Sequence, residues 1–468
     1  MIPISNNIIS NLEIVDIAED GRSIGRHENV VVFVKDAVPG DWVDVKIIKK
    51  KKKFIEGKVD KIITPSPNRI IPFCEHFGTC GGCKWQYLTY SQQLFYKQKQ
   101  VEDCLQRIAK IEIDGIIQPI KPSARIQHYR NKLEYTFSSY RWLTDKDMEN
   151  SSEELNMNAL GFHIPGRFDK VLDIQNCYLQ NAPSNDIRLF IKDYALKNNL
   201  EFFDIKKQTG FLRNIIIRTS LTGEVMVIVV FFYDDEVMMN SLLDELSNRF
   251  PEITSLMYVV NSKKNDIITD LKINCYKGNP YIIDMMGTLK YKIGPVSFFQ
   301  TNSLQGYELY KIVAEYADLK GTEVVYDLYT GTGTIANFVA ASALKVVGVE
   351  YVPEAINDAK ENSFINNISN TSFYAGDMNK VLNDKFLEEN GMPDVVITDP
   401  PRSGMHKDVI IQLLKMEAEK IIYVSCNPST QARDIEMLKE KYIPVKVQPV
   451  DMFPHTQHVE NVVLLTKK

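Results

Sequence analysis

Residues 324–336 read VVYDLYTGTGTIA, and this stretch decides the fold of the C-terminal part of the chain. The apolar run VVYDL is typical of a buried strand, and Gly331 and Gly333 follow it before an apolar helix begins. Two glycines let the backbone pass close to a ligand, because no Cβ stands in the way. A dinucleotide site or a tight turn would use the same pattern, so the glycines alone leave the ligand open.

Further apolar runs repeat this strand–loop–helix alternation at 345–351 (KVVGVEY), 394–400 (DVVITDP) and 420–428 (KIIYVSCNP). The alternation predicts a parallel sheet wrapped by helices, in which ligands bind at the carboxyl ends of the strands. We therefore assign residues 276–468 to a Rossmann-like α/β domain. Glu350 ends its strand where a carboxylate can accept hydrogen bonds from two ribose hydroxyls, and a solvated strand end is the alternative.

Two aspartates distinguish between candidate cofactors. Asp377, in YAGDMNK, follows the next strand at a position where it can accept a hydrogen bond from an adenine amine. Asp399 begins DPPRSG, and its paired prolines stiffen the loop. A strand followed by D-P-P-R is typical of methyltransferases that act on planar nitrogen or carbon atoms of bases. We therefore expect S-adenosylmethionine (SAM) rather than a nicotinamide cofactor.

Cys426, in SCNP, is predicted to lie in the same ligand crevice. A free cysteine is most often a small buried hydrophobe. Here its thiolate could instead add to C6 of uracil, which makes C5 electron-rich enough to accept a methyl group. Free thiols have a pKa of about 8.5, so the pocket must favour the thiolate, and Arg402 is a candidate for that effect.

A base must then remove the C5 proton before the thiolate can leave. Glu460, at the start of an apolar strand in HTQHVENVVLL, is the candidate, and His455 and His458 are alternatives. Asp399 could have a second role, because a hydrogen bond to the uracil edge would select and position the base.

The first sixty residues alternate short β-branched runs with turn residues, which predicts a small antiparallel barrel over residues 1–62. Its second half is rich in lysine, and charge alone gives even odds between phosphate binding and a solvated hairpin. The lysines are Lys46, Lys49, Lys50, Lys51, Lys52, Lys53, Lys58 and Lys61. The region resembles the TRAM domain, a small RNA-binding barrel, and the resemblance favours RNA contact.

The bulk properties are those of a soluble globular protein. A length of 468 residues suggests about three domains, and the composition is 44% hydrophobic and 25% charged. No apolar run approaches the roughly 20 residues that span a bilayer. The N-terminus carries no export signal, so we expect a cytoplasmic protein without a membrane partner. The net charge of −5 shows that any nucleic-acid contact must be local.

Residues 63–275 are predicted to form a mixed α+β central domain that contains a cysteine cluster. Cys74, Cys80 and Cys83 have the spacing C-x5-C-x2-C, and Cys177 follows far along the chain. Four thiolates suit a tetrahedral zinc or an iron–sulfur cluster, and the spacing does not separate them. Cys104 and Cys275 are left over and are expected to be structural.

Together these motifs resemble the RumA/TrmA family of RNA uracil-5 methyltransferases. The resemblance covers nearly the whole chain, from the TRAM-like barrel through FFQTN, DLYTGTGTIA, DPPRSG and SCNP to HVEN. It implies that Cys426 is the nucleophile and Glu460 the base. The residues that the resemblance assigns to SAM are Gln300, Tyr329, Glu350, Asp377 and Asp399. Thr334 stands where some relatives have asparagine.

The RumA branch of that family has both the TRAM domain and a [4Fe–4S] cluster, whereas TrmA-type tRNA enzymes lack both. The resemblance therefore implies a cluster on Cys74, Cys80, Cys83 and Cys177, a 23S rRNA substrate, a monomer and no DNA partner. A uridine must leave its stack to be methylated. Candidate RNA contacts around the pocket are Phe298, Phe299, His128, Tyr129, Arg130 and Lys132.

Three alternatives remain open. The substrate could be a uridine in the T-loop of tRNA. The chain could be a non-catalytic RNA-binding or assembly protein, although the presence of Cys426, Glu460 and Asp399 argues against that. Methylation of an exocyclic amine would use D-P-P but would not need a nucleophilic cysteine.

Overall fold

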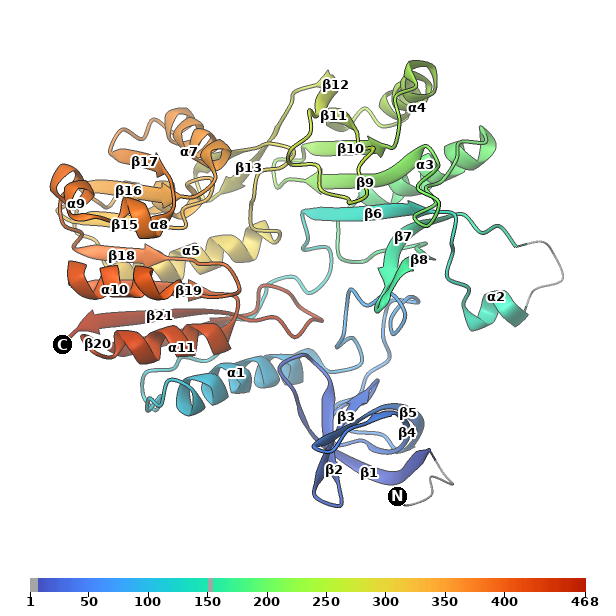
Figure 1. Cartoon of the computed structure of the whole chain (residues 1–468), viewed down its shortest axis with the longest axis horizontal. Helices are drawn as coiled ribbons and strands as arrows, with labels where there is room; N and C mark the ends of the chain where they lie inside the picture. The colour runs from blue at the N-terminus through green and yellow to red at the C-terminus, as the bar shows by residue number, and fades with distance from the viewer. Residues whose placement is uncertain (1–6, 150–154) are drawn as a thin grey trace.

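The computed structural model describes residues 7–149 and 155–468, and its N-terminal unit is a closed barrel (Figure 1). The barrel strands are β1 (Ile8–Ile17), β2 (Ser23–His27), β3 (Val30–Lys35), β4 (Trp42–Lys50) and β5 (Phe54–Thr64), in the order β1-β2-β3-β5-β4. Apolar side chains from alternate positions, including Ile14, Val32 and Val43, fill its interior. The predicted barrel is confirmed, although β3 and β5 pair in parallel rather than antiparallel.

A seven-stranded sheet of order β12-β11-β10-β9-β6-β7-β8 forms the centre of the described chain. Its strands are β6 (Lys132–Ser138), β7 (Ala159–Ile164), β8 (Arg167–Asp173), β9 (Leu212–Thr219), β10 (Val225–Phe231), β11 (Ile253–Val260) and β12 (Asn274–Gly278). Helices α3 (Ser184–Lys197) and α4 (Glu236–Arg249) pack on one face, and α2 (Asp145–Glu149) lies in the connection after β6. The other face shares a core with the C-terminal part of the chain, so the two units pack as one body.

The C-terminal sheet has the order β17-β16-β15-β18-β19-β21-β20. It consists of β15 (Val324–Leu328), β16 (Lys345–Glu350), β17 (Thr371–Ala375), β18 (Val395–Thr398), β19 (Lys420–Ser425), β20 (Tyr442–Val450) and β21 (Glu460–Lys467). The first five strands along the chain are parallel, and β21 enters antiparallel between β19 and β20. The predicted Rossmann-like α/β fold is confirmed, and its last two strands form an antiparallel pair.

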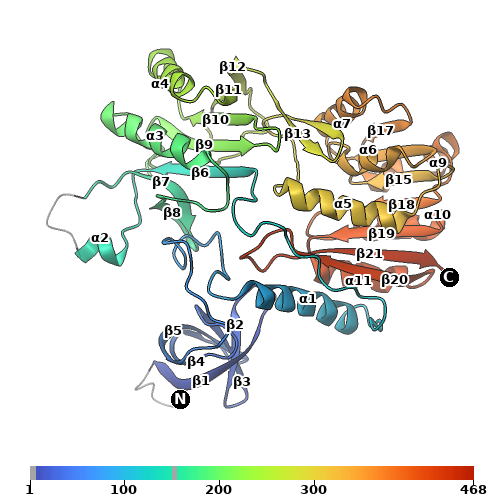
Figure 2. The same ribbon diagram turned by 180° about the vertical axis from the view of Figure 1, so that it is seen from behind.

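Helices cover both faces of this sheet, as Figure 1 and Figure 2 show from opposite sides. On one face lie α5 (Ser303–Ala317), α6 (Thr334–Ala340) and α7 (Pro353–Ile365), next to the hairpin β13 (Ile282–Met286) and β14 (Leu289–Ile293). On the other lie α8 (Met378–Val381), α9 (Asp384–Asn390), α10 (Lys407–Met416) and α11 (Pro428–Leu438). No helix in residues 7–149 or 155–468 is long and apolar enough to cross a membrane.

Helix α1 (Tyr90–Arg107) lies between the barrel and the C-terminal sheet (Figure 1). It precedes the central sheet in the chain, yet its Val101 and Leu105 pack in the core beneath β19 and β21. The predicted division at residues 62/63 and 275/276 therefore stays a prediction, because α1 and the central sheet both share cores with the C-terminal unit.

A buried ion pair joins α1 to the segment that follows β20. Lys97 and Asp451 are both fully buried, and Lys97 Nζ donates to Asp451 Oδ1 at 2.5 Å and to the carbonyl of Phe453 at 3.0 Å. The Tyr90 hydroxyl donates to the other carboxylate oxygen of Asp451 at 2.8 Å. Each charge is thus paired and hydrogen-bonded, which a charge inside a core requires.

We expect Lys97→Met to lower the free energy of unfolding by about 3–5 kcal/mol, because it leaves the Asp451 carboxylate buried without its cation. Denaturant titration followed by tryptophan fluorescence measures this. Lys99→Met is the matched control on the same helix, since Lys99 pairs with Asp16 and Asp103 at the partly exposed surface. Its loss should cost at most about 1 kcal/mol. Equal losses for the two variants would contradict the assignment.

Candidate active site

The carboxyl ends of four parallel strands meet at one edge of the C-terminal sheet. Leu328 of β15 lies opposite Val349 of β16 and Thr398 of β18. Thr398 in turn lies opposite Tyr423 of β19. The polar residues that follow these positions are Tyr329, Glu350, Asp399 and Cys426. The sheet therefore brings together residues that are nearly a hundred positions apart in the sequence.

The loop after β15 forms a cradle with an open centre. Gly331 has a φ of +55° and no atom lies within 4 Å of where its Cβ would be, so the space before it is free for a ligand. Its N–H donates to Glu350 Oε2 at 3.2 Å, and Glu350 Oε1 accepts from Val352 N at 3.0 Å. Tyr329 is also left-handed, with a φ of 62°. A tyrosine in that conformation is held by its surroundings and is a frequent mark of a binding loop.

Asp327, which the sequence analysis missed, lies beneath this cradle. Its Oδ2 accepts from Thr330 Oγ1 at 2.5 Å and from Ala336 N at 3.0 Å. Its Oδ1 is buried and has no hydrogen-bond partner among the described residues. Burial raises the pKa of Asp327 to about 7, and the two hydrogen bonds oppose the shift. An acidic residue inside the apolar run VVYDL was the available signal.

A cavity of about 710 Å³ opens beside the cradle, and Tyr329, Tyr351 and Asp377 line it. Asp377 also caps α8, because its Oδ1 accepts from Asn379 N at 3.1 Å. Gln300 is buried, and its main-chain oxygen accepts from Asn131 Nδ2 at 2.8 Å.

Thr334 is buried beside the cradle at the start of α6. Its hydroxyl lies 2.9 Å from the Tyr310 hydroxyl. The Thr334 hydroxyl, which stands where some relatives have asparagine, thus has a hydrogen-bond partner within the protein.

Hydrogen bonds join the SCNP loop (residues 425–428) to the DPPR loop (residues 399–402). Asn427 caps α11 by accepting from Ser429 N at 3.1 Å, and Pro428 occupies the first turn, where its missing N–H has no cost. Asn427 Nδ2 and Thr430 Oγ1 both donate to the carbonyl of Arg402, at 3.0 and 3.1 Å. The helix cap therefore fixes Cys426 relative to the loop that carries Arg402.

Acidic side chains surround Cys426. Burial raises the pKa of the half-buried Cys426 thiol to about 11, and the carboxylates of Glu460 and Asp399 add to the shift, while Arg402 opposes it. Burial raises the pKa of Asp399 to about 7, with a contribution from Asp327. Burial also raises the pKa of Glu460 well above its usual value, with Asp399 adding and Arg402 opposing. Arg402 is the cation that favours the ionised forms of both Cys426 and Glu460.

Cys426 lines a separate cavity of about 290 Å³ with Arg402, His458 and Val459, and the barrel loop contributes Glu19 and Asp20 to its wall. Arg402 Nη2 lies 3.1 Å from His458 Nδ1. Burial, together with Arg402, lowers the pKa of His458 to about 4, so its ring is neutral at pH 7.

Of the two histidines considered as bases, only His458 is among the residues that line this cavity. His455 is buried against Gln93 of α1 instead.

The predicted RNA contacts divide into two groups. Phe299 and Tyr129 are both 5% exposed, so these two predictions were wrong. Phe299 packs in the core, and the Tyr129 hydroxyl donates to the carbonyl of Pro454 at 3.0 Å. Phe298 is 67% exposed and remains available to a ligand, and Arg130 lies over the ring of Phe453 at 5.3 Å.

The four cysteines predicted as metal ligands lie around one cavity of about 380 Å³: Cys74, Cys80, Cys83 and Cys177. Burial raises the pKa of Cys80 and of Cys83 to about 12, and the other thiols of the group add to both shifts. Within the described residues, no three His, Cys, Asp or Glu side chains are arranged to hold a metal ion. Of the remaining cysteines, Cys104 is buried and Cys275 is exposed.

Comparison with known proteins places this architecture in a family. The sequence profile of the family described as tRNA (Uracil-5-)-methyltransferase matches residues 207–468, and that of the TRAM domain matches residues 11–59. An uncharacterized RNA methyltransferase of Bacteroides thetaiotaomicron is 54% identical over 452 residues, covering 96% of this chain and 99% of that protein. One from Porphyromonas gingivalis is 52% identical over 463 residues, covering 97% and 99%.

Among solved structures, the chain is similar to the tRNA (uracil-54, C5)-methyltransferase of Pyrococcus abyssi in complex with S-adenosyl-L-homocysteine. The TM-score is 0.76 at 29% identity, and the match covers 97% of this chain and 99% of the other. The predicted class I methyltransferase fold with an N-terminal TRAM barrel is therefore confirmed. The chain belongs to the tRNA (uracil-5-)-methyltransferase family of SAM-dependent RNA methyltransferases.

Proposed function

We propose that this chain methylates C5 of a uridine in 23S rRNA through a covalent bond between Cys426 Sγ and C6 of the base. One observation carries the proposal: Cys426 lines a small cavity with Arg402 and His458, at the strand end where Glu460 and Asp399 also converge. A cavity of about 290 Å³ has room for one unstacked pyrimidine base.

In the proposed reaction the Cys426 thiolate adds to C6, and the C5–C6 π electrons move to make C5 nucleophilic. The thiol loses its proton only if its negative charge is stabilised, because burial and two carboxylates raise its pKa to about 11. Arg402 supplies that stabilisation with its positive charge. His458, which contacts Arg402, has a lowered pKa and stays neutral, so it adds no second positive charge.

Glu460 would complete the reaction. After C5 has gained the methyl group, a carboxylate oxygen of Glu460 takes the C5 proton, the C5–C6 double bond re-forms, and the thiolate leaves C6. Burial and Asp399 raise the pKa of Glu460, which makes its ionised form a stronger proton acceptor than an exposed glutamate. Asp399, half-buried at the same edge, would accept a hydrogen bond from the uracil N3–H.

The residues around the cradle fit SAM. Glu350 accepts from the Gly331 N–H at the cradle, and Tyr329 and Asp377 line the adjoining cavity of about 710 Å³, so these residues would hold the cofactor. Asp399 acts electrostatically on Cys426, and the Gln300 side chain lies beside Gly306 of α5. When bound, SAM supplies the electrophilic methyl group and a positive charge.

We also propose a [4Fe–4S] cluster on Cys74, Cys80, Cys83 and Cys177. The donor set fits, because the four thiols line one cavity of about 380 Å³ and burial makes uncompensated thiolates costly there. A cluster takes one thiolate on each of four irons, so its ligands surround a volume rather than a point.

The 23S rRNA assignment rests on the barrel and the cysteine set together, which resemble the RumA branch. The second candidate is tRNA, which the Pyrococcus enzyme favours: it is named for tRNA uracil-54 and matches 97% of this chain, so its match extends into the barrel. The barrel alone therefore does not separate the two substrates. In either case we propose a monomer that acts in the cytoplasm.

RNA that contains 5-fluorouracil should trap the protein in the presence of SAM, because fluorine at C5 cannot leave as a cation. We expect a protein–RNA complex that survives denaturing electrophoresis and disappears in Cys426→Ala. Cys275→Ala, which removes an exposed cysteine far from the site, should trap normally. Glu460→Gln should accumulate the complex even with ordinary RNA. A complex retained in Cys426→Ala would overturn the mechanism.

The substrate can be identified by mapping 5-methyluridine in 23S rRNA and tRNA from cells with and without the gene. We expect one or more 23S sites to lose the modification and the tRNA sites to keep it. Restoring the wild-type gene should return the modification, whereas a gene encoding Cys426→Ala should not. Loss confined to tRNA would establish the second candidate instead.

Protein purified without oxygen should be brown, with a broad absorption band at the blue end of the visible spectrum and about four irons per chain. Cys83→Ser should lose most of the iron and the band, because it removes one of four thiolate ligands. Cys104→Ser, at a buried cysteine outside the cavity, is the control and should keep both. A colourless protein with one zinc per chain would contradict the cluster.

A further inference from the structure

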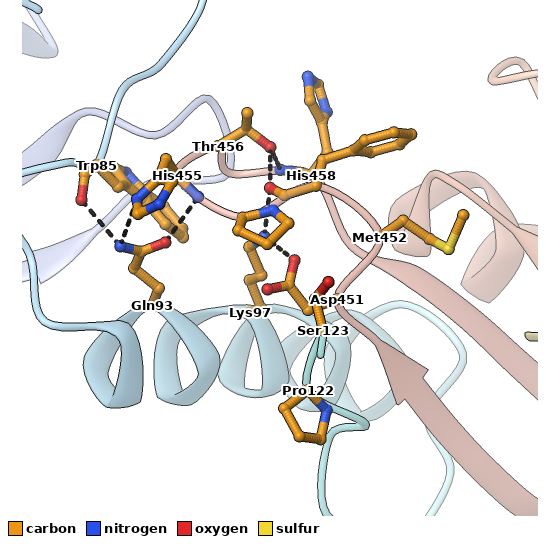
Figure 3. Close-up of polar contacts among 12 residues, drawn as sticks. Trp85, Gln93, Lys97, Pro122, Ser123, Asp451, Met452, His455, Thr456 and His458 are labelled. Carbon is orange, nitrogen blue, oxygen red and sulfur yellow. Dashed lines mark hydrogen bonds and ion pairs between the residues drawn. The ribbon is translucent and has the colours of Figure 1, made fainter. Parts of the chain in front are cut away.

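The loop of residues 451–459 carries His455 and His458 past helix α1 (Figure 3). His458 lines the Cys426 cavity, and Glu460 follows the loop as the first residue of β21. Its ends are close together, because Val450 of β20 pairs with Glu460 of β21. Between them the chain leaves the sheet and returns, so the loop brings His458 to the cavity and leads directly into Glu460.

His455 is one of several points at which other segments hold this loop, beside the Lys97 contacts to Asp451 and Phe453 and the Tyr129 contact to Pro454. It has a φ of 65°, a left-handed conformation that persists for a histidine only where its surroundings fix it. Its N–H donates to Gln93 Oε1 at 2.8 Å. Its carbonyl accepts from the N–H groups of Lys84 and Trp85, at 2.8 and 3.1 Å. Both backbone groups of the strained residue are thus satisfied by segments outside the C-terminal domain.

Gln93 of α1 is the side chain that organises this contact. It is fully buried, and its Nε2 donates to the carbonyls of Trp85 and Leu88 at 3.1 and 2.9 Å. The same amide lies 3.2 Å from His455 Nδ1. Since Oε1 accepts the His455 N–H, the amino group faces the two carbonyls and the ring. One amide therefore ties together α1, the segment that follows Cys83 and the strained loop.

From this geometry we infer that Gln93 is a positioning residue for proton removal by Glu460, acting through His455. The inference rests on the proposed function. Gln93 is not among the residues that line the Cys426 cavity, so it has no direct part in the chemistry. Cys426 is held independently, because the Asn427 cap and the Arg402 carbonyl fix it from another strand. Loss of Gln93 should therefore affect the step that uses the loop and spare the step that uses the thiolate.

The two steps can be followed separately in a single turnover. RNA with tritium at C5 of uridine reports proton removal, and SAM with a ¹⁴C methyl group reports methyl transfer. In Gln93→Leu we expect methyl transfer at close to the wild-type rate. Tritium release should be slower by about 10-fold to 100-fold, the effect of displacing a reacting group by about 1 Å. A covalent, methylated protein–RNA complex should accumulate meanwhile.

Gln98→Leu is the matched control on the same helix. Gln98 accepts from Ile120 N and donates to Glu102, so it contacts neither His455 nor its loop. Its two rates should keep the wild-type ratio. His455→Asn provides a second variant should Gln93→Leu fold poorly: asparagine tolerates the left-handed backbone but removes the ring that faces Gln93.

The ratio of the two rates decides between the possibilities. A selective delay of tritium release in Gln93→Leu or His455→Asn supports the inference. An unchanged ratio of the two rates, whether or not both are slowed, overturns it. The same delay in Gln98→Leu also overturns it. Wild-type protein that transfers no methyl group to uracil C5 would refute the proposed function itself, and that result is distinct from a functional wild type with unaffected variants.

Discussion

The site depends on one electrostatic constraint, which is the convergence of acidic groups at a poorly solvated edge of the sheet. Asp327, Asp399 and Glu460 all have raised pKa values there, and burial is the largest cause for each. Burial also raises the pKa of the Cys426 thiol. A buried negative charge must be neutralised by a proton or a nearby cation. Arg402 lowers the pKa of two of these groups, and a positively charged cofactor would act in the same direction.

The architecture around this edge serves to hold the charged groups in place. The helix cap of Asn427 ties the cysteine loop to the carbonyl of Arg402, and the cradle backbone ties Gly331 to Glu350. Each of these contacts joins the ends of two different strands. Parallel strands leave such groups adjacent without connecting them, so the cross-loop hydrogen bonds convert a shared edge into a fixed arrangement.

Sequence patterns predicted the parts of this arrangement that are local. The buried strand runs, the glycine loop and the polar strand ends gave the α/β sheet and put Glu350, Asp399 and Cys426 at one edge. The barrel was also predicted, apart from the parallel pairing of β3 with β5, which requires a crossover that strand patterns do not encode. Burial at single positions was harder to predict, because Phe299 and Tyr129 carry no local sign of the core that encloses them.

Contacts between segments far apart in the chain were also not predicted from the sequence. Nothing in the periodicity of α1 indicates that it packs beneath β19 and β21, more than three hundred residues away, or that Gln93 meets His455. Asp327 carried a signal, a carboxyl within an apolar strand, but its role follows only from the loop that folds over it. Contacts of this kind depend on the complete tertiary structure, so the sequence alone identifies the chemical groups and leaves their support unassigned.

The position of α1 also explains how the three units share one site. The barrel loop places Glu19 and Asp20 in the wall of the Cys426 cavity, the segment after Cys83 holds the carbonyl of His455, and the C-terminal sheet supplies the reactive groups. Two carboxylates in the wall disfavour a phosphate and are compatible with a neutral base. The lysines of β4 and β5 are not among the residues that line this cavity. The barrel thus carries its acidic loop and its lysine-rich strands at different places, and only the acidic loop borders the cavity.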